Sequence, residues 1–501
     1  MKLTLEQEKI IAFDGDMKIN AVAGSGKTST LVEYARARPN ARMLYLVFNK
    51  SVKQESQQKF AKNNIRNVTV ETAHSLAYRE IVVGSDFKVK PSDFKLKEVI
   101  DILEITGFPR KHDSFIIANH VLKFISYFCN SPVKNVKDLN YISALSSSKA
   151  LEFVTENYEY IEKYTRKLLA KMYNAEVEIT HDFYLKMFQV SQPVLDYDVV
   201  LFDEGQDASG SILDIFCNQK ATKVIVGDTH QQIYAWRFAV NSLDKVDVQN
   251  FELNTSFRFG AGIANLATEI LRWKLKFIPE YTNTVPVLTG AGGFSTENSK
   301  AVIARTNISL LAEAIRQVSN SDDPIYFEGN IQSYTYASEG TSLYDVLNLW
   351  KGSKDYIKDP LIKQMLHFEE LKDYVDKVDD VQIKNMITIV EEYGSRIPSL
   401  IQKVKSLQVS ENEKNKAAVI YSTVHKSKGM EYDHVELTED FTTYMKLKKV
   451  VDKGVDAITA SKINEEINSL YVAITRAKRT ITIPRDCVPF QVGESEEIRL
   501  K

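Results

Sequence analysis

The chain has few cysteines, no long apolar run and almost no net charge, and each absence excludes a class of protein. Its three cysteines, Cys129, Cys217 and Cys487, lie far apart and offer no zinc spacing or disulfide framework, which suits a reducing cytosol. No segment approaches about 18 consecutive apolar residues, so we predict no membrane span. The formal net charge of -2 lacks the basic excess that marks a passive nucleic-acid binder.

The length and the first residues set further limits. The 501 residues are enough for roughly three or four compact units of about 150 residues each. Residues 1–7 carry charges where a secretion signal needs an apolar run, so we expect no signal peptide. We expect a cytoplasmic, nucleoid-associated protein, or a nuclear one, depending on the host.

Alternating strand and helix patterns predict a parallel α/β core in each half of the chain. Residues 80–190 lose the strand pattern and contain amphipathic helical segments such as 150–173. Residues from about 330 to 415 are likewise mostly helical and rich in charge. The predicted strands are 17–22, 42–48, 68–72, 199–202, 223–227 and 251–253 in the first half, and 301–305, 324–327, 418–421 and 480–483 in the second.

These patterns predict a domain organisation in which each α/β core is interrupted by a helical insertion. The glycine cluster at 290–293 is a predicted hinge or loop between the halves. Lys446, Lys448 and Lys449 are assigned to a loop-like region that either meets duplex phosphate or forms a solvated face. The predicted domains are 1–79 with 191–285, its insertion 80–190, then 286–329 with 416–490, its insertion 330–415, and a tail at 491–501.

A glycine-rich loop follows the first predicted strand and precedes a helical run. Backbone N–H groups of such a loop can wrap an anion, and the helix that follows adds its positive end. We therefore predict that the loop binds the phosphates of ATP, that Lys27 reaches the β- and γ-phosphates, and that Thr28 coordinates Mg²⁺. Ala21 stands where the strict pattern has Gly. The residues of the predicted cradle are Ala23, Gly24, Ser25, Gly26, Lys27, Thr28 and Ser29.

Two adjacent carboxylates end the predicted strand at 199–202. We predict that Asp203 holds Mg²⁺ and that Glu204 is the base that orients the attacking water, because phosphoryl transfer depends on positioning and charge neutralisation. The alternative, a solvated acidic turn, leaves the upstream phosphate loop without a partner.

Several segments, in this order and spacing, resemble the superfamily 1 helicases of the UvrD/Rep type over almost the whole chain. The resemblance implies two RecA-like parallel-sheet P-loop domains, each interrupted by a mainly helical insertion. The segments are Gln7, Ala21–Thr28, Asp203–Asp207, Gly227–Arg237, Val424–Glu431 and Leu470–Ala477.

Within this family the chain is most similar to the F-box DNA helicases. We expect no F-box, because the motor motifs start within about ten residues of Met1. Gly205 replaces the family's usual Ala, a change that we do not expect to alter the chemistry. The stretches that carry this similarity are Leu44–Ser51, His181–Lys186, Phe327–Tyr334 and Arg396–Pro398.

The resemblance assigns residues to the nucleoside of ATP. Gln7 would read the adenine edge, and Glu431, close to Gly429, would contact the ribose. Phe257 stands where the family usually has Tyr, so its ring can still stack on adenine without a hydroxyl.

The resemblance also assigns residues to the phosphates. Gln231 would sense the γ-phosphate. Arg258 and Arg476 would act as arginine fingers from the two halves, since a guanidinium fork neutralises charge that develops on the transferring phosphoryl group. Taken singly, each of these residues could be an ordinary surface charge.

Aromatic and small polar residues are expected to line the path of the nucleic acid. Tyr234 and Trp236 share a face if their segment is extended, and stacking on a base is worth about 1–3 kcal/mol. Both rings could instead be core residues. Phe238 replaces the family's usual Gly. By resemblance the single-strand contacts are Asn49, Thr72, His74, Ser75, Tyr234, Trp236, Arg237 and His425.

Together these observations predict an ATP- and Mg²⁺-dependent DNA translocase and helicase, acting as a monomer on single-stranded and duplex or forked DNA. The family implies 3′→5′ movement, and the F-box helicase likeness suggests recombination control, including removal of a recombinase. One alternative is the motor subunit of a nuclease or phage-defence complex that translocates without unwinding. Another is an ATP-dependent switch, against which Glu204 and both fingers argue.

Overall fold

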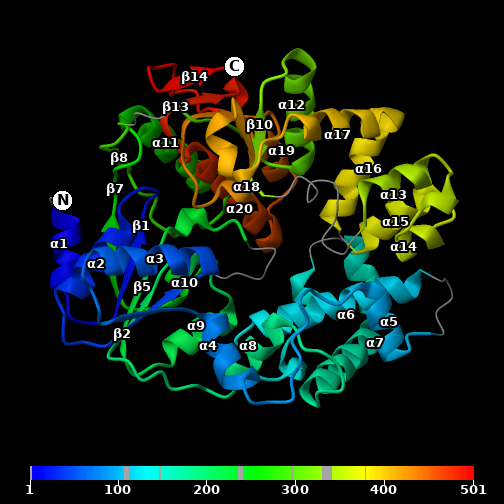
Figure 1. The fold of residues 1–501 in the computed structure, drawn as a ribbon, viewed down its shortest axis with the longest axis horizontal. Helices are drawn as coiled ribbons and strands as arrows, with labels where there is room; N and C mark the ends of the chain where they lie inside the picture. The colour runs from blue at the N-terminus through cyan, green and yellow to red at the C-terminus, as the bar shows by residue number, and fades with distance from the viewer. Residues whose placement is uncertain are drawn as a thin grey trace.

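Two parallel sheets form the two halves of the molecule, and each half carries a helical insertion (Figure 1). The computed structural model describes residues 3–106, 112–145, 148–234, 241–294, 298–329, 341–378 and 380–501. Each sheet has six strands, all paired in parallel. The α/β fold class predicted from the sequence is therefore confirmed.

The first sheet has the order β3-β2-β4-β5-β1-β6. Its central strands β2 and β4 are buried throughout, which explains their continuous apolar runs. Since all strands point the same way, the loops that follow them gather at one edge of the sheet. The strands are β1 (Met17–Ala21), β2 (Met43–Val47), β3 (Val68–Thr72), β4 (Val199–Phe202), β5 (Thr222–Gly227) and β6 (Gln249–Leu253).

The helices of the first half begin at side-chain caps in most places. Thr4 and Gln7 form a reciprocal capping box at α1, and Ser209 caps α9. The helices are α1 (Leu5–Ala12), α2 (Lys27–Arg36), α3 (Lys50–Lys62), α4 (Ala73–Ala77), α9 (Gly210–Cys217) and α10 (Ser242–Lys245), and the first insertion holds α5 (Leu96–Leu103), α6 (Asp113–Asn130), α7 (Ser148–Tyr173) and α8 (His181–Val190).

The second sheet has the order β10-β11-β9-β12-β13-β14. Its strands are β9 (Lys300–Ala304), β10 (Ile325–Phe327), β11 (Val419–Thr423), β12 (Tyr432–Leu437), β13 (Ala477–Ile483) and β14 (Ile498–Leu500). Its helices are α11 (Ala261–Phe277), α12 (Asn307–Asn320), α18 (Val424–Ser427), α19 (Tyr444–Val451) and α20 (Ala457–Ile474), and the second insertion holds α13 (Leu343–Trp350), α14 (Pro360–Gln364), α15 (Phe368–Val378), α16 (Val381–Tyr393) and α17 (Ile397–Ser406).

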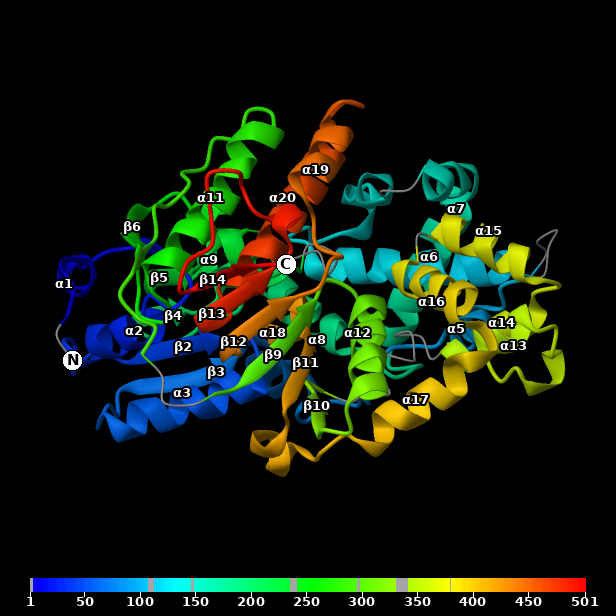
Figure 2. The same ribbon diagram turned by 90° about the horizontal axis from the view of Figure 1, so that it is seen from above.

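The two helical insertions pack against each other. Figure 2 shows α15 and α16 of the second insertion beside α6 and α7 of the first. Buried apolar residues of both insertions belong to one continuous core. At its rim Lys149 pairs with Asp376 at 2.8 Å, and a ring nitrogen of His112 lies 3.1 Å from a carboxylate oxygen of Glu370. The insertions therefore add a second contact between the two halves.

Helix α11 differs from the sequence prediction, which places it in the first domain. Its apolar residues Ile263 and Ile270 share a buried core with Ile303 of β9 and Ile467 of α20. The chain thus leaves the first sheet after β6 and enters the second core at α11. The segment between them, residues 254–260, carries Phe257 and Arg258.

The glycine cluster at 290–293 is fixed against this crossing segment rather than free. β8 (Thr289–Gly290) pairs with β7 (Thr255–Ser256). The N–H of Gly292 donates to the carbonyl of Phe259 at 3.0 Å. A Cβ built on Gly292 would lie 2.4 Å from the carbonyl oxygen of Phe257, so only glycine fits there.

Two predictions for the C-terminal region are corrected. Residues 491–501 are no free tail, because β14 extends the second sheet beside β13 and Glu497 accepts from the N–H of Ile263, at the positive end of α11. Lys446, Lys448 and Lys449 lie on helix α19, which Thr443 caps, and not in a loop. Over the described ranges, we find no helix with the length and apolar character needed to cross a membrane.

Candidate nucleotide and nucleic-acid sites

The glycine-rich loop joins β1 to α2 and leaves its backbone open for an anion. Gly24 and Gly26 both have left-handed backbone angles, with φ of 74° and 79°. A Cβ on Gly24 would lie 2.6 Å from the Cβ of Arg258, so the loop needs glycine for space as well. Gly26 is the N-cap of α2 and offers no side chain to its first-turn N–H groups. These groups therefore point from the positive helix end toward the place of a phosphate.

Lys27 and Glu204 form an ion pair at this loop. The ammonium lies 3.1 Å from the carboxylate of Glu204, with the lysine side chain 13% exposed and the glutamate side chain 31% exposed. Burial works against the charged lysine, but Glu204, Asp203 and Asp228 outweigh it and raise the pKa of Lys27. Burial likewise works against the charged glutamate, but Lys27 and Lys428 lower the pKa of Glu204 to about 2. Both groups are therefore charged at neutral pH, and a phosphate would compete with Glu204 for the lysine.

Asp203, one of the two predicted magnesium ligands, accepts from the hydroxyl of Tyr45 at 2.5 Å through Oδ2. Thr28, the other predicted ligand, lies in the first turn of α2. Burial and the neighbouring Glu204 raise the pKa of Asp203. The described residues hold no group of three His, Cys, Asp or Glu side chains able to bind a metal alone. One hydroxyl and one carboxylate nevertheless suit Mg²⁺, which keeps several waters and uses few protein ligands beside phosphate oxygens.

The turn after β4 holds Glu204 in a strained conformation. Its φ of 54° is in the left-handed region, which is uncommon for a residue with a side chain. Gly205 packs against β5 so closely that a Cβ would lie 2.5 Å from Ile225, which accounts for glycine where the family has Ala. Gln206 donates to Glu204 at 2.7 Å and accepts from the N–H of Asp228, so it fixes the carboxylate relative to β5.

Arg476 comes from the second half and lies buried at the junction with the first. It is 1% exposed, and its guanidinium lies 3.4 Å from the amide oxygen of Gln231. Burial, followed by the nearby Arg258, lowers the pKa of Arg476 to about 9, so it remains cationic at neutral pH. Gln231 in turn donates to Asp228 at 2.8 Å. The structure thus brings Arg476 to the predicted γ-phosphate sensor of the other half.

Arg258 and Glu431, predicted to contact ATP at different places, pair with each other at 3.0 Å. Arg258 also donates to the carbonyl of Thr475, next to Arg476. Glu431 follows shortly after Gly429, which has a φ of 84°. Both predicted fingers therefore lie at the same junction between the halves.

Gln7 and Phe257 lie together beside the phosphate loop. A Cβ on Gly26 would be within 4.0 Å of both side chains. Gln7 accepts from the N–H of Thr4 and donates to Thr30 at 3.1 Å, so its amide group is held in a fixed orientation. The two residues predicted to read adenine are thus neighbours, next to the start of α2.

Lys428 and Tyr471 are two further cross-half contacts that sequence reasoning did not single out. Lys428 pairs with the buried Asp207 and donates to the carbonyl of Gln231 at 2.7 Å. Tyr471 donates to Asp228 at 3.0 Å and accepts from the N–H of Ala23. Both residues lie inside motifs already identified, so their positions were visible in the sequence, but their partners in the other half were not.

The predicted nucleic-acid residues Tyr234 and His425 touch each other across the two halves. Tyr234 donates to the carbonyl of His425 at 3.1 Å, and the two ring centroids are 5.9 Å apart. Phe48, at the end of β2, stacks parallel to Tyr234 with centroids 6.2 Å apart. Sequence reasoning missed Phe48, although it adjoins Asn49. Trp236 and Arg237 lie outside the described residues.

Asn49, Thr72 and Ser75 have structural roles that the sequence analysis did not include. Asn49 caps α3 by accepting from Val52, and Thr72 forms a reciprocal capping box with Ser75 at α4. His74 is partly exposed, with its ring at a near right angle to that of Tyr184 and a nitrogen 3.7 Å from Asp182. These four predicted contacts lie at or just after the ends of β2 and β3, so they share the sheet edge that carries the phosphate loop.

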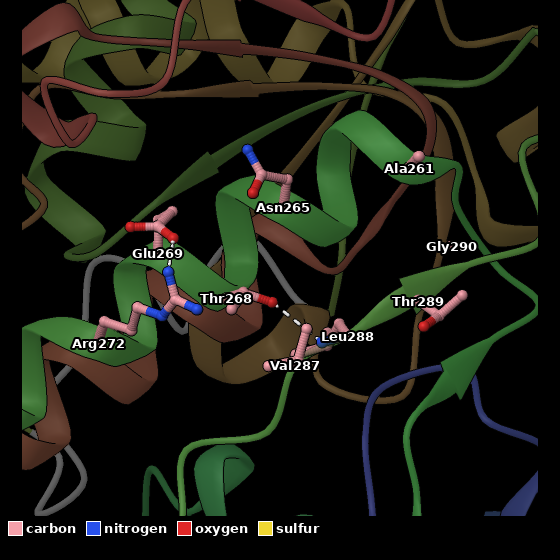
Figure 3. A pocket seen from close by; sticks show the side chains of 9 residues that line it. All are labelled: Ala261, Asn265, Thr268, Glu269, Arg272, Val287, Leu288, Thr289 and Gly290. Atoms are coloured by element: carbon pink, nitrogen blue, oxygen red, sulfur yellow. Dashed lines mark hydrogen bonds and ion pairs between the residues drawn. The ribbon is translucent and has the colours of Figure 1, made fainter.

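A separate cavity of about 250 Å³ lies between α11 and residues 287–290 (Figure 3). In Figure 3 Arg272 points to Glu269, and Thr268 accepts from the N–H of Leu288. None of the predicted site residues lines this cavity. The geometry therefore gives it no part in the nucleotide chemistry.

Comparison with known proteins agrees with this geometry. Residues 3–246 match the family of the UvrD/REP helicase N-terminal domain. The chain is 31% identical to F-box DNA helicase 1 of Gallus gallus, over 96% of this chain and 49% of that protein. It is 28% identical to F-box DNA helicase protein 1 of Schizosaccharomyces pombe, over 96% of this chain and 57% of that protein.

A third relative, the ATP-dependent DNA helicase Rep of Buchnera aphidicola, is 22% identical over 92% of this chain and 75% of its own length. The chain thus spans about half the length of the two F-box helicases. Its first half matches the family model, and its similarity to these relatives runs through both halves. Residues 3–246 therefore belong to the family of the UvrD/REP helicase N-terminal domain, and the chain as a whole is similar to helicases of this family.

Proposed function

We propose that this chain is an ATP-dependent DNA helicase that translocates on single-stranded DNA and separates duplex or forked DNA. The observation that carries the proposal is the junction between the halves. Lys27, Asp203 and Glu204 lie on the first half, and the buried Arg476 of the second half bonds to Gln231, the proposed γ-phosphate sensor of the first. A site divided in this way can couple hydrolysis to relative movement of the halves.

The residues have distinct roles in the proposed reaction. ATP would supply the phosphoryl group, and Thr28 and Asp203 would hold its Mg²⁺. Lys27 would leave Glu204 for the phosphates, which frees Glu204 to accept a proton from an oriented water. Arg476 and Arg258 would neutralise the charge that develops on the transferring group. Gln7 and Phe257 would position the base.

The same junction supports coupling to DNA. Gln231 bonds to Arg476 through its side chain and to Lys428 through its carbonyl, three residues before Tyr234. Tyr234 in turn bonds to His425 of the second half. A change in the phosphate site that shifts Gln231 would therefore shift the aromatic contact as well, and bases stacked on it would move with the cleft.

The finer parts of the proposal rest on the family. We propose 3′→5′ movement and a role in recombination control that includes displacement of a recombinase from DNA, in the compartment that holds the host's DNA. The relatives named above are helicases, so a motor subunit that translocates without unwinding is not favoured.

An unwinding assay tests the proposal. The full chain with ATP and Mg²⁺ is given duplexes that carry a single-stranded tail at either the 3′ or the 5′ end, and hydrolysis is followed with and without single-stranded DNA. We expect DNA-stimulated hydrolysis and unwinding from the 3′ tail. Stimulation without unwinding would contradict the helicase activity, and hydrolysis that DNA does not affect would contradict the DNA motor altogether.

A further inference from the structure

Tyr45 is a buried polar group that the proposed mechanism does not yet use. It lies at the centre of β2, is 0% exposed, and packs in the core between the sheet and helices α2 and α3. Its ring meets that of Phe60 edge to face with centroids 5.2 Å apart. The neighbours Leu44 and Leu46 point to the core on the opposite face of the sheet. Packing between the sheet and these helices therefore holds the ring in one position, which also fixes the direction of its hydroxyl.

The hydroxyl of Tyr45 meets the carboxylate of Asp203, one of the two predicted magnesium ligands, and donates to Asp203 Oδ2 at 2.5 Å. The other oxygen of Asp203 accepts from the N–H of Glu204 at 2.9 Å. Both oxygens of the carboxylate are thus oriented by fixed donors, and each keeps a lone pair free.

A phenol has one proton, and Tyr45 gives it to Asp203, since an ionised carboxylate can only accept. This bond and the one from the N–H of Glu204 fix the directions in which the carboxylate presents its remaining lone pairs. Neighbours that orient a metal ligand in this way strengthen its hold on the ion.

From this arrangement we propose that Tyr45 is a positioning residue for the Mg²⁺ that accompanies ATP, acting through Asp203. It sets the orientation of this ligand before the ion arrives. The inference rests on the nucleotide-binding part of the proposed function and not on translocation.

The test removes one oxygen. Tyr45→Phe keeps the ring and its packing, and the melting temperature checks that the fold persists. Affinity for a fluorescent ADP analogue is measured in the full chain, first with a chelator and then over a Mg²⁺ titration. We expect unchanged metal-free affinity and a half-saturating Mg²⁺ concentration raised about 10- to 100-fold.

The matched control is Tyr34→Phe. Tyr34 lies in the same core, is also buried, and has Arg38 over its ring at 3.7 Å. A Tyr45→Phe protein whose Mg²⁺ dependence matches that of Tyr34→Phe would overturn the proposal. An equal loss of affinity with and without Mg²⁺ would overturn it too, because it would show a structural role only.

A double-mutant cycle with Asp203→Ala provides a second measurement. Since Tyr45 acts through Asp203, Tyr45→Phe should raise the Mg²⁺ requirement of the Asp203 variant much less than that of the wild type. An undiminished effect of Tyr45→Phe in the Asp203 variant would contradict the proposal. If the wild-type chain binds Mg²⁺-nucleotide but does not unwind DNA, only the helicase proposal fails. If it binds no nucleotide, both fail.

Discussion

In each sheet a strand leads through a short turn into a helix. One of these two turns is open to an anion, whereas the other already holds a carboxylate of the protein. Between β1 and α2 the turn is glycine-rich and its N–H groups are open. Between β9 and α12 the turn is filled by Asp440, which accepts from the N–H groups of Arg305 and Thr306 at 3.0 and 2.8 Å. The hydroxyls of Thr306 and Thr438 donate to the same carboxylate.

The difference shows how one architecture can serve two purposes. A helix N-terminus after a parallel strand attracts negative charge in both halves. The second half satisfies its own turn with an internal carboxylate, whereas the first leaves the place for a ligand. The second half then contributes cations, Lys428 and Arg476, to the open site of the first. In the proposed mechanism, the turn between β1 and α2 binds the nucleotide, and the second half controls its hydrolysis.

The largest expected effect comes from Arg476, a cation that the second half contributes. Arg476→Lys keeps the charge but loses the planar fork, so we expect kcat for DNA-stimulated hydrolysis to fall by about 10³-fold or more. Nucleotide affinity should change only a few-fold, as measured with a fluorescent analogue. Arg485→Lys, in the same half and bonded to the carbonyl of Val492, is the control. Equal losses of kcat in both variants would contradict a role for Arg476 in the transition state.

The next largest effect concerns the open half. Glu204→Gln keeps the shape of the side chain but cannot accept a proton, so we expect kcat to fall by about 10²- to 10⁴-fold while ATP still binds. Pre-steady-state hydrolysis and nucleotide titration separate the two quantities. Glu33→Gln, on α2 and paired with Arg36 at the surface, should leave both unchanged. Retained turnover in the Glu204 variant would refute its role as base.

The turn between β9 and α12, which Asp440 fills, can be opened by substitution. Asp440→Ala removes the carboxylate that accepts from two backbone N–H groups and two hydroxyls, so we expect the free energy of unfolding to fall by about 2–3 kcal/mol. Urea denaturation measures this loss, with the exposed Asp452→Ala as control. Inorganic phosphate should stabilise the Asp440 variant more than the wild type, because it can occupy the opened turn. Absence of that difference would contradict the comparison between the turns.

The last expected effect is a pH dependence of stability, which arises at the contact between the halves. Lys274 of α11 is buried and bonds to His230 of the first half at 2.8 Å and to Asn468 of α20. Burial lowers the pKa of Lys274 to about 7, against the opposing charges of Asp228 and Asp244. In the unfolded chain Lys274 keeps a pKa near its usual value.

The folded state therefore binds fewer protons than the unfolded state above about pH 7, and stability rises with pH. The slope contributed by Lys274 is at most about 1.4 kcal/mol per pH unit between pH 7 and 10. Below pH 7 Lys274 is charged in both the folded and the unfolded state, so it no longer adds to the slope of stability against pH. Urea denaturation from pH 6 to 9.5 should show this rise in the wild type and a flatter profile in Lys274→Met. Parallel profiles would contradict it.

Much of the fold was predictable because parallel strands that are buried on both faces leave continuous apolar runs. Val199–Phe202 and Val68–Thr72 were placed at their observed bounds. The strand β12 was missed, since Asp433 and His434 interrupt its apolar pattern. The buried Asp433 accepts from the N–H and the hydroxyl of Ser299 and lies 3.7 Å from the ammonium of Lys478, and no local pattern reveals these contacts between distant residues.

The candidate site likewise has a part that local sequence patterns predict and a part that they do not. The loop at Gly24–Lys27 and the carboxylates after β4 follow from local patterns, so the sequence predicts them. The pairing of Lys428 with Asp207 and the bond from Tyr471 to Asp228 depend on how the halves meet. The sequence around Tyr45 predicts only a strand, and it does not indicate that the hydroxyl reaches Asp203 on another strand's turn.

The crossing segment at 254–260 has a mechanical consequence. Phe257 bonds through its N–H to the carbonyl of Gly24 at 2.9 Å, and its own carbonyl packs directly against Gly292. The link between the two halves and the ring proposed to stack on adenine are therefore one stretch of chain. In the proposed motor, separation of the halves would draw Phe257 away from the phosphate loop, so nucleotide release and the return of the halves would be a single movement.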